Sequence, residues 1–129
     1  MAAPGDSFLL RKPNYDFDHL WIVLTAPHPQ NSEIIIVNVT GQQGHSDTTT
    51  ILIVGEHPFV KKPSVIHYAD ARKTDSKLID QALARGLASS HRQCSKAFLT
   101  KIQSGLLASP HTTPMIRAAF LSAQRDGRT

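Results

Sequence analysis

The chain has 129 residues, of which 40% are hydrophobic and 19% are charged, and its formal net charge is +4. This length and composition fit one small globular domain and exclude collagen, long coiled coils and disulfide scaffolds. No apolar run approaches the roughly 20 residues that a membrane-spanning helix needs, no secretory signal is evident, and Cys94 is the only cysteine. We therefore expect a cytoplasmic protein that has no membrane partner.

The charge is unevenly distributed along the chain. Residues 1–60 hold two Lys or Arg against six Asp or Glu, whereas the remainder holds twelve against four. A basic second half suits a polyanionic partner such as RNA, because phosphate contacts release counterions. The alternative is a solvated helical surface that carries scattered Lys and Arg.

The first half of the chain consists of short apolar runs separated by turn residues. Such spacing predicts a mainly β unit whose strands cover residues 7–10, 20–25, 33–40, 48–54 and 64–68. Several of these runs are apolar at consecutive positions, so both faces of the sheet must be covered. This pattern favours a closed barrel, or a sheet covered by helices.

The second half changes to helical spacing. Residues 75–85 predict a short helix that presents Leu78, Ile79 and Leu83. Ser90 and Gln93 have the spacing of a capping box and predict a helix over residues 90–108. Thr113 and Pro114 suit the N-cap and first turn of another helix, which would bury Met115, Ile116, Ala119 and Phe120. We expect one domain over residues 1–124, followed by a frayed tail over 125–129.

The order of these segments carries a family resemblance. Pro4-Gly5-Asp6 precedes the first strand, residues 34–40 form an apolar strand that ends in Thr40, and Lys61-Lys62-Pro63-Ser64-Val65-Ile66 and the stretch Asp-Ala-Arg-Lys-Thr-Asp-Ser at 70–76 follow. From about residue 4 to 107 this order resembles the MazF/PemK family of toxin endoribonucleases. The resemblance implies a small Src-homology-3-like β-barrel followed by one or two amphipathic helices. It also implies a homodimer, single-stranded RNA as substrate and an antitoxin protein as partner.

Two candidate catalytic residues stand at strand ends. In the resemblance His19 takes the position of the family's catalytic Arg, and Thr40 that of its functional Thr. Cleavage of RNA through the ribose 2′-hydroxyl needs a base and an acid, and His supplies either form near neutral pH. His19 sits where a polar loop enters an apolar strand, at the rim of the expected barrel. A loop-capping role for the His19 ring is the alternative.

Candidate RNA-binding residues follow in the second half of the chain. They are His57, Lys61 and Lys62 in one loop, and Arg72, Lys73 and Lys77 after the last predicted strand. His57 also fits a solvated turn, the other basic residues fit exposed charge without function, and His67 fits a satisfied core or interface histidine. Trp21, Phe59 and Tyr68 either stack bases or belong to the core.

Other chemistry has little support in the sequence. His91 and Cys94 are metal-ligand types without a second pair at zinc-finger spacing, and no Gly-rich phosphate loop is present. We therefore expect neither a cofactor nor a metal. Two hypotheses remain: a metal-independent endoribonuclease, or a non-catalytic small barrel that binds nucleic acid or a partner protein.

Overall fold

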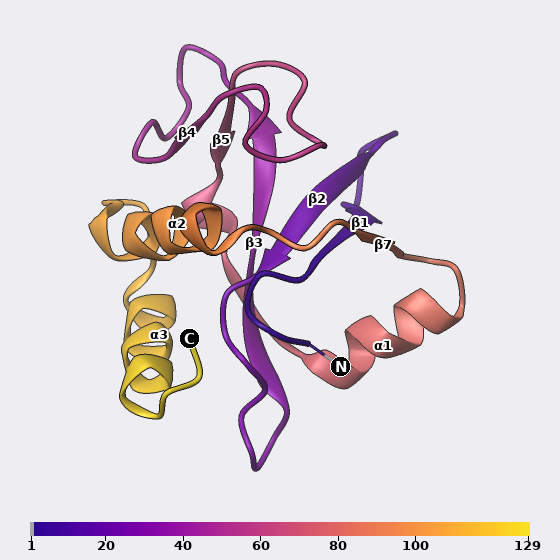
Figure 1. Cartoon of the computed structure of the whole chain (residues 1–129), viewed down its shortest axis with the longest axis vertical. Coiled ribbons are helices and arrows are strands. Elements are labelled where there is room, and N and C mark those ends of the chain that lie inside the picture. The colour runs from indigo at the N-terminus through magenta and orange to yellow at the C-terminus, as the bar shows by residue number, and fades with distance from the viewer. Residues whose placement is uncertain (1) are drawn as a thin grey trace.

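A computed structural model describes residues 2–129 of the chain (Figure 1). Within this range the chain forms a mixed α/β fold with a seven-stranded antiparallel sheet and three α-helices. The elements in chain order are β1 (Ser7–Arg11), β2 (Asp18–Val23), β3 (Glu33–Gly41), β4 (Ile51–Leu52), β5 (Ser64–Ile66), a 3₁₀ turn (Tyr68–Asp70), β6 (Arg72–Asp75), α1 (Ser76–Ala84), β7 (Ser89–His91), α2 (Lys96–Ala108) and α3 (Pro114–Arg125). The prediction of a mainly β domain with helices is confirmed.

The long strand β3 organises the sheet. Along one edge it pairs with β2, and along the other edge it pairs with β6 near its start and with β5 near its end. The order of strands is β4-β5-β3-β2-β1-β7, with β6 beside β3. Within residues 2–129, no strand pairing joins β4 to β7 at the two ends of this order.

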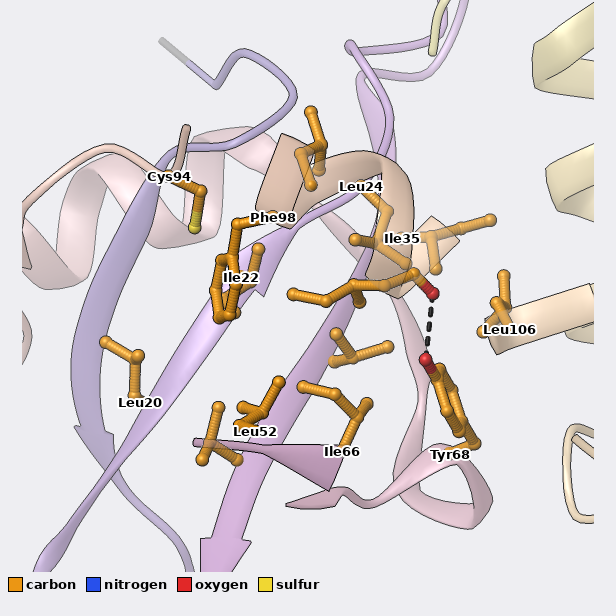
Figure 2. Close-up of a cluster of buried hydrophobic side chains, with 14 of the residues drawn as sticks. Leu20, Ile22, Leu24, Ile35, Leu52, Ile66, Tyr68, Cys94, Phe98 and Leu106 are labelled. Carbon is orange, nitrogen blue, oxygen red and sulfur yellow. Dashed lines mark hydrogen bonds between the residues drawn. The ribbon is translucent and has the colours of Figure 1, made fainter. Parts of the chain in front are cut away.

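Helices α2 and α3 cover one face of the sheet (Figure 1). Phe98, Leu99, Ile102 and Leu106 of α2 are buried as predicted and pack with β2 and β3 residues such as Leu20. Figure 2 shows this core, in which the Tyr68 hydroxyl donates a hydrogen bond of 2.9 Å to the Ile102 carbonyl.

Helix α2 approaches Tyr68 closely because its residue 105 is glycine. A Cβ atom built on Gly105 would lie 2.1 Å from the Tyr68 hydroxyl oxygen and 2.1 Å from the Thr50 hydroxyl oxygen. The same two hydroxyl groups hydrogen-bond to each other at 2.6 Å. Only glycine therefore lets this turn of the helix rest on the hydroxyl pair.

The opposite face of the sheet is covered over part of its area by α1. Ile79 of α1 packs with Trp21, Val23, Ile34 and Ile36. Asp75 caps this helix by accepting a hydrogen bond from the Lys77 amide, which agrees with the predicted helix start. Leu78, however, is exposed, so the helix presents a narrower apolar face than predicted.

Several predicted boundaries change in the structure. The strand predicted over 48–54 is only β4, because the Asp47 carboxylate accepts hydrogen bonds from Thr49 and the Glu56 carboxylate accepts one from the Ile53 amide. Strands β6 and β7 are absent from the prediction, since neither has the β-branched and aromatic composition of a strand.

The helix predicted from Ser90 begins later. Ser90 belongs to β7, and Ser95 is the residue that caps α2, accepting a hydrogen bond from the Phe98 amide. Thr113 caps α3 as predicted, but Met115 is 62% exposed instead of buried.

The predicted frayed tail is hydrogen-bonded to the connection between β2 and β3. The Arg128 carbonyl accepts a 2.7 Å hydrogen bond from the Ala26 amide, and the Arg128 guanidinium donates one to the Ala26 carbonyl. No helix in residues 2–129 combines the length and the apolar character needed to cross a bilayer.

Candidate functional site

A cleft of about 680 Å³ opens at the end of the sheet that α1 leaves uncovered. The strands β2, β3 and β5 supply its floor, and the segments that follow β1, β3, β4 and α2 supply its walls. Its lining includes the predicted residues His19, Thr40, Lys61 and Lys62, together with His45, His67, His111, Lys12, Asp18, Asp47, Tyr15, Phe17 and Phe59.

Strand register explains why His19 and Thr40 lie level with each other on neighbouring strands. Trp21 pairs with Asn38 across β2 and β3, and continuing this antiparallel register brings His19 level with Thr40. On the far side of β3, Thr40 pairs with Val65. Because side chains at every second position share a face, His19, Trp21, Asn38 and Thr40 all belong to the face opposite α2 and α3.

His19 is held deep in the wall of the cleft. It is 3% exposed, and its ring lies at 4.8 Å from the Tyr15 ring and at 4.9 Å from the Phe17 ring, which stacks on it. Burial lowers the pKa of His19, and the neighbouring Lys12 charge lowers it further. The imidazole is therefore neutral at pH 7, which is the form that accepts a proton.

The polar atoms on this face lack protein partners to an unusual degree. Within residues 2–129, the buried side-chain atoms that make no hydrogen bond are His19 Nδ1, Trp21 Nε1 and Asn38 Oδ1. All three belong to neighbouring positions on the cleft face of β2 and β3. Since buried polar groups are nearly always paired, this face of the sheet differs from the apolar face beneath α2 and α3.

An ionic network borders the same face. The Asp70 carboxylate receives Lys12 at 2.7 Å, Arg72 at 2.8 Å and the Asn38 side-chain amide at 2.9 Å. Burial acts to raise the pKa of Asp70, but the hydrogen bonds and charges of Lys12 and Arg72 outweigh it, and the net pKa is lowered. Asp70 is therefore ionised at neutral pH and neutralises part of the positive charge beside the cleft.

Lys62 lies beside Gly41 at the end of β3. Its Cε atom would lie 3.2 Å from a Cβ built on Gly41, the residue that follows Thr40, so its stem crosses the end of β3. Lys61 and Lys62 are both exposed. Two exposed positive side chains therefore line the cleft, where they would attract an anion.

The far wall contains Asp47 and His111. Burial acts to raise the pKa of Asp47, but hydrogen bonds from Ser109 and Thr49 and the nearby His111 lower it overall. The Ser109 hydroxyl donates to Asp47 at 2.6 Å. This contact ties the connection between α2 and α3 to the cleft.

Four of the predicted RNA-binding residues do not line the cleft. His57 is 2% exposed, its Nε2 donates to the Arg92 carbonyl at 2.9 Å, and its Nδ1 accepts from the Phe59 amide. Its ring is thus neither in a solvated turn nor available to RNA, because both nitrogens serve the fold. Arg72 lies over the Trp21 ring, Lys73 faces Glu33 at 3.9 Å, and Lys77 is on the surface of α1.

The three aromatic residues that could either stack bases or belong to the core lie in different environments. Trp21 and Tyr68 are buried, whereas Phe59 lines the cleft. The sequence did not single out Lys12, Tyr15, Phe17 or Asp47, because their roles depend on loops that converge only in the folded chain. Asn38 carried a usable signal, since it is an isolated amide inside the apolar run of β3.

Among residues 2–129, no three His, Cys, Asp or Glu side chains converge to hold a metal ion. Comparison with models of protein families, with curated protein sequences and with solved structures finds no match for this chain.

Proposed function

We propose that this protein is a toxin-like endoribonuclease of a toxin–antitoxin system and that it cleaves single-stranded RNA without a metal ion. The observation that carries the proposal is His19, a buried and neutral imidazole with an unpartnered Nδ1 in the wall of a cleft that Lys61 and Lys62 also line. A neutral imidazole in that place supports a role as general base.

The reaction uses the ribose of the substrate as nucleophile. His19 takes the proton of the 2′-hydroxyl, the 2′-oxygen attacks phosphorus, and the bond from phosphorus to the 5′-oxygen breaks. The 5′-oxygen takes up a proton as it leaves, and the products are a 2′,3′-cyclic phosphate and a 5′-hydroxyl. Thr40 donates a hydrogen bond to the phosphate, and Lys61 and Lys62 stabilise its negative charge.

The walls of the cleft suit an unpaired strand. Tyr15 and Phe17 are 46% and 59% exposed, and with Phe59 they offer aromatic surface beside the phosphate-binding side chains. Stacking on aromatic rings requires bases that are free of a duplex, and it contributes about 1–3 kcal/mol per base. This combination supports single-stranded RNA over duplex RNA as substrate.

The decisive experiment incubates the purified chain with single-stranded RNA in the presence of a chelator. Wild-type protein should produce 2′,3′-cyclic phosphate ends, and His19→Ala should lower the rate by about 10²–10⁴-fold, the usual contribution of general acid–base catalysis. Thr40→Val should cost less, since it removes one hydrogen bond. RNA that stays intact across a broad set of sequences, yet binds with strong salt dependence, would favour the non-catalytic binding module.

The proposal extends to the fold family and the assembly. The meander of β1, β2 and β3, with β5 and β6 sharing one edge of β3, supports a relationship to the Src-homology-3-like barrel. Ile51, Ile53 and Val54 are exposed at and beside the edge strand β4, which supports a homodimer, because apolar edges are usually covered. Light scattering at micromolar concentration should give a dimer, and a monomer would contradict this part.

An antitoxin partner and a cytoplasmic site of action complete the proposal. Expression of the wild-type chain should arrest growth by degrading RNA, whereas expression of His19→Ala should not. Normal growth at a verified level of active protein would argue against the role as a toxin while leaving the ribonuclease activity to the assay in solution.

A further inference from the structure

His67 is a second imidazole on the floor of the cleft. Its backbone amide donates a 3.0 Å hydrogen bond to the Asn38 carbonyl, which continues the register in which Val65 pairs with Thr40. His67 therefore shares the sheet face of Asn38 and Thr40. Its side chain is half-buried and lines the cleft, as that of His19 does.

The two imidazoles stand on opposite sides of β3. His19 belongs to β2 on one side of Thr40, and His67 follows β5 on the other side. Two strand spacings separate their backbones by roughly 10 Å across the sheet, and two residues of offset add about 7 Å along it. Both side chains line the cleft, and the charge of His67 is the smallest of the causes that act on the pKa of His19.

This placement matches the geometry of the proposed reaction. In an in-line displacement the entering and leaving oxygens lie on opposite sides of phosphorus. A phosphate held over Thr40 would thus present its 2′-oxygen toward one imidazole and its 5′-oxygen toward the other. A base and an acid on the two sides satisfy what the cleavage needs.

The other histidines fit the second role less well. His45 and His111 line the cleft from the segments after β3 and α2, so strand register does not place them, and His111 neighbours the Asp47 carboxylate. His28, His57 and His91 are not among the cleft residues. His67 is therefore the histidine that register places across β3 from His19, level with Asn38.

We propose that His67 is the general acid of the reaction, an assignment that rests on the proposed ribonuclease function. The His67 imidazolium gives its proton to the 5′-oxygen as the bond from phosphorus to that oxygen breaks. His19 meanwhile holds the proton taken from the 2′-hydroxyl. One proton is gained and one is lost by the pair, and exchange with water restores both rings before the next cleavage.

The test uses two RNA oligonucleotides that differ in one atom, the 5′-bridging oxygen or a sulfur in its place. A thiolate leaves without protonation because thiols are far more acidic than alcohols. His67→Ala should cleave the oxygen substrate about 10²–10⁴-fold more slowly than wild type, yet should cleave the sulfur substrate at nearly the wild-type rate. His19→Ala should be slow on both substrates, since the sulfur does not replace the base.

Rescue by sulfur also shows that His67→Ala is folded, so loss of structure cannot imitate the result. His28→Ala, in the distant β2–β3 hairpin, is the matched control and should cleave both substrates like wild type. A His67→Ala variant that is unimpaired, or equally slow on both substrates, would overturn the assignment and leave the ribonuclease function intact. A wild-type chain that cleaves neither substrate would instead overturn the proposed function and the acid together.

Discussion

The two faces of β2 and β3 are built from alternate residues of the same strands, yet they differ in kind. On the face beneath α2 and α3, Leu20, Ile22, Val37 and Val39 are all aliphatic and all buried. On the other face the corresponding positions are His19, Trp21, Asn38 and Thr40. One face is closed by helices, whereas the other is closed by α1 at one end and open at the cleft.

This difference between the two faces shows which residues lower the free energy of unfolding. A buried polar group without a partner costs about 1–3 kcal/mol, and this polar face carries three such atoms. An apolar side chain in place of His19 or Asn38 would carry no such cost. Departures from consistent packing are expected at functional sites, and of these three residues His19 lines the cleft.

The largest expected effect is a difference in the free energy of unfolding between two Phe→Ala variants, one on each side of the sheet. Phe120 of α3 is fully buried under the helix-covered face, whereas Phe17 is 59% exposed at the cleft. Phe120→Ala should lower the free energy of unfolding by about 3–5 kcal/mol, because it leaves a cavity in the core.

Phe17→Ala should change the free energy of unfolding by less than about 1 kcal/mol, because an exposed ring loses little packing, while it weakens RNA binding. Urea denaturation and a binding titration measure both properties for each variant. If Phe17→Ala proved as destabilising as Phe120→Ala, the cleft face would be part of the core and the contrast between the faces would fail.

A smaller effect is expected at the ionic network beside the cleft. Asp70→Asn leaves Lys12, whose side chain is 9% exposed, without its carboxylate partner. Loss of one member of a buried ion pair costs about 3–5 kcal/mol, and the partial exposure of Asp70 reduces our expectation to about 2–3 kcal/mol. Asp16→Asn, at an exposed loop position, is the control and should leave stability unchanged.

The pH dependence of this network has a defined sign. Because the pKa of Asp70 is lowered from 3.8 in the folded chain, its ionised form stabilises the fold above that value. The stabilisation is lost as the pH falls from about 4 through the lower folded pKa. The free energy of unfolding of Asp70→Asn should therefore fall less with decreasing pH in this range than that of wild type. An equal fall in both proteins would show that the network contributes little to stability.

The smallest effect is expected from an apolar replacement on the cleft face. His19→Leu removes an unpartnered Nδ1 and should be neutral or stabilising by up to about 1 kcal/mol at pH 8, while it slows cleavage about as much as His19→Ala does. In wild type the unfolded chain binds a proton near pH 6.5, whereas the folded chain binds it only at lower pH, because burial lowers the pKa of His19.

Wild-type stability is therefore full above pH 6.5 and falls as the pH drops below it. His19→Leu should show a weaker decline between pH 7 and 5 in urea denaturation. Part of the decline should remain, since burial also lowers the pKa of His57. A variant with the full wild-type decline would show that His19 is not held neutral by the fold.

Sequence patterns predicted much of the helix-covered face. The apolar runs of β2 and β3 and the spacing of Phe98, Ile102 and Leu106 depend on local periodicity, and the structure follows them. Strand β6 was missed because Arg72 and Lys73 have no intrinsic preference for a strand. Their pairing with Ile36 and Ile35 of β3 arises from tertiary contact alone.

The cleft was predictable only where a residue's position on a strand determined its place. His19 and Thr40 end up side by side because both lie at strand ends on the same face. The position of a loop residue in the sequence does not determine its direction in this way. His57 is only two positions from the cleft residue Phe59, yet its side chain is buried and donates a hydrogen bond to the Arg92 carbonyl. The direction of a loop side chain depends on partners that are distant in sequence, and local patterns do not contain them.

Trp21 gives the molecule a built-in optical reporter. It is the single tryptophan of the chain, it is 2% exposed, and both Lys12 Nζ, at 5.8 Å from the ring centroid, and Arg72 Cζ, at 5.0 Å, lie over its ring. Lys12 also lines the cleft, so an anion that draws this ammonium toward itself alters the electric field across the indole. Tryptophan emission can therefore follow occupation of the cleft without any attached dye, and in unlabelled protein that signal comes from one known position.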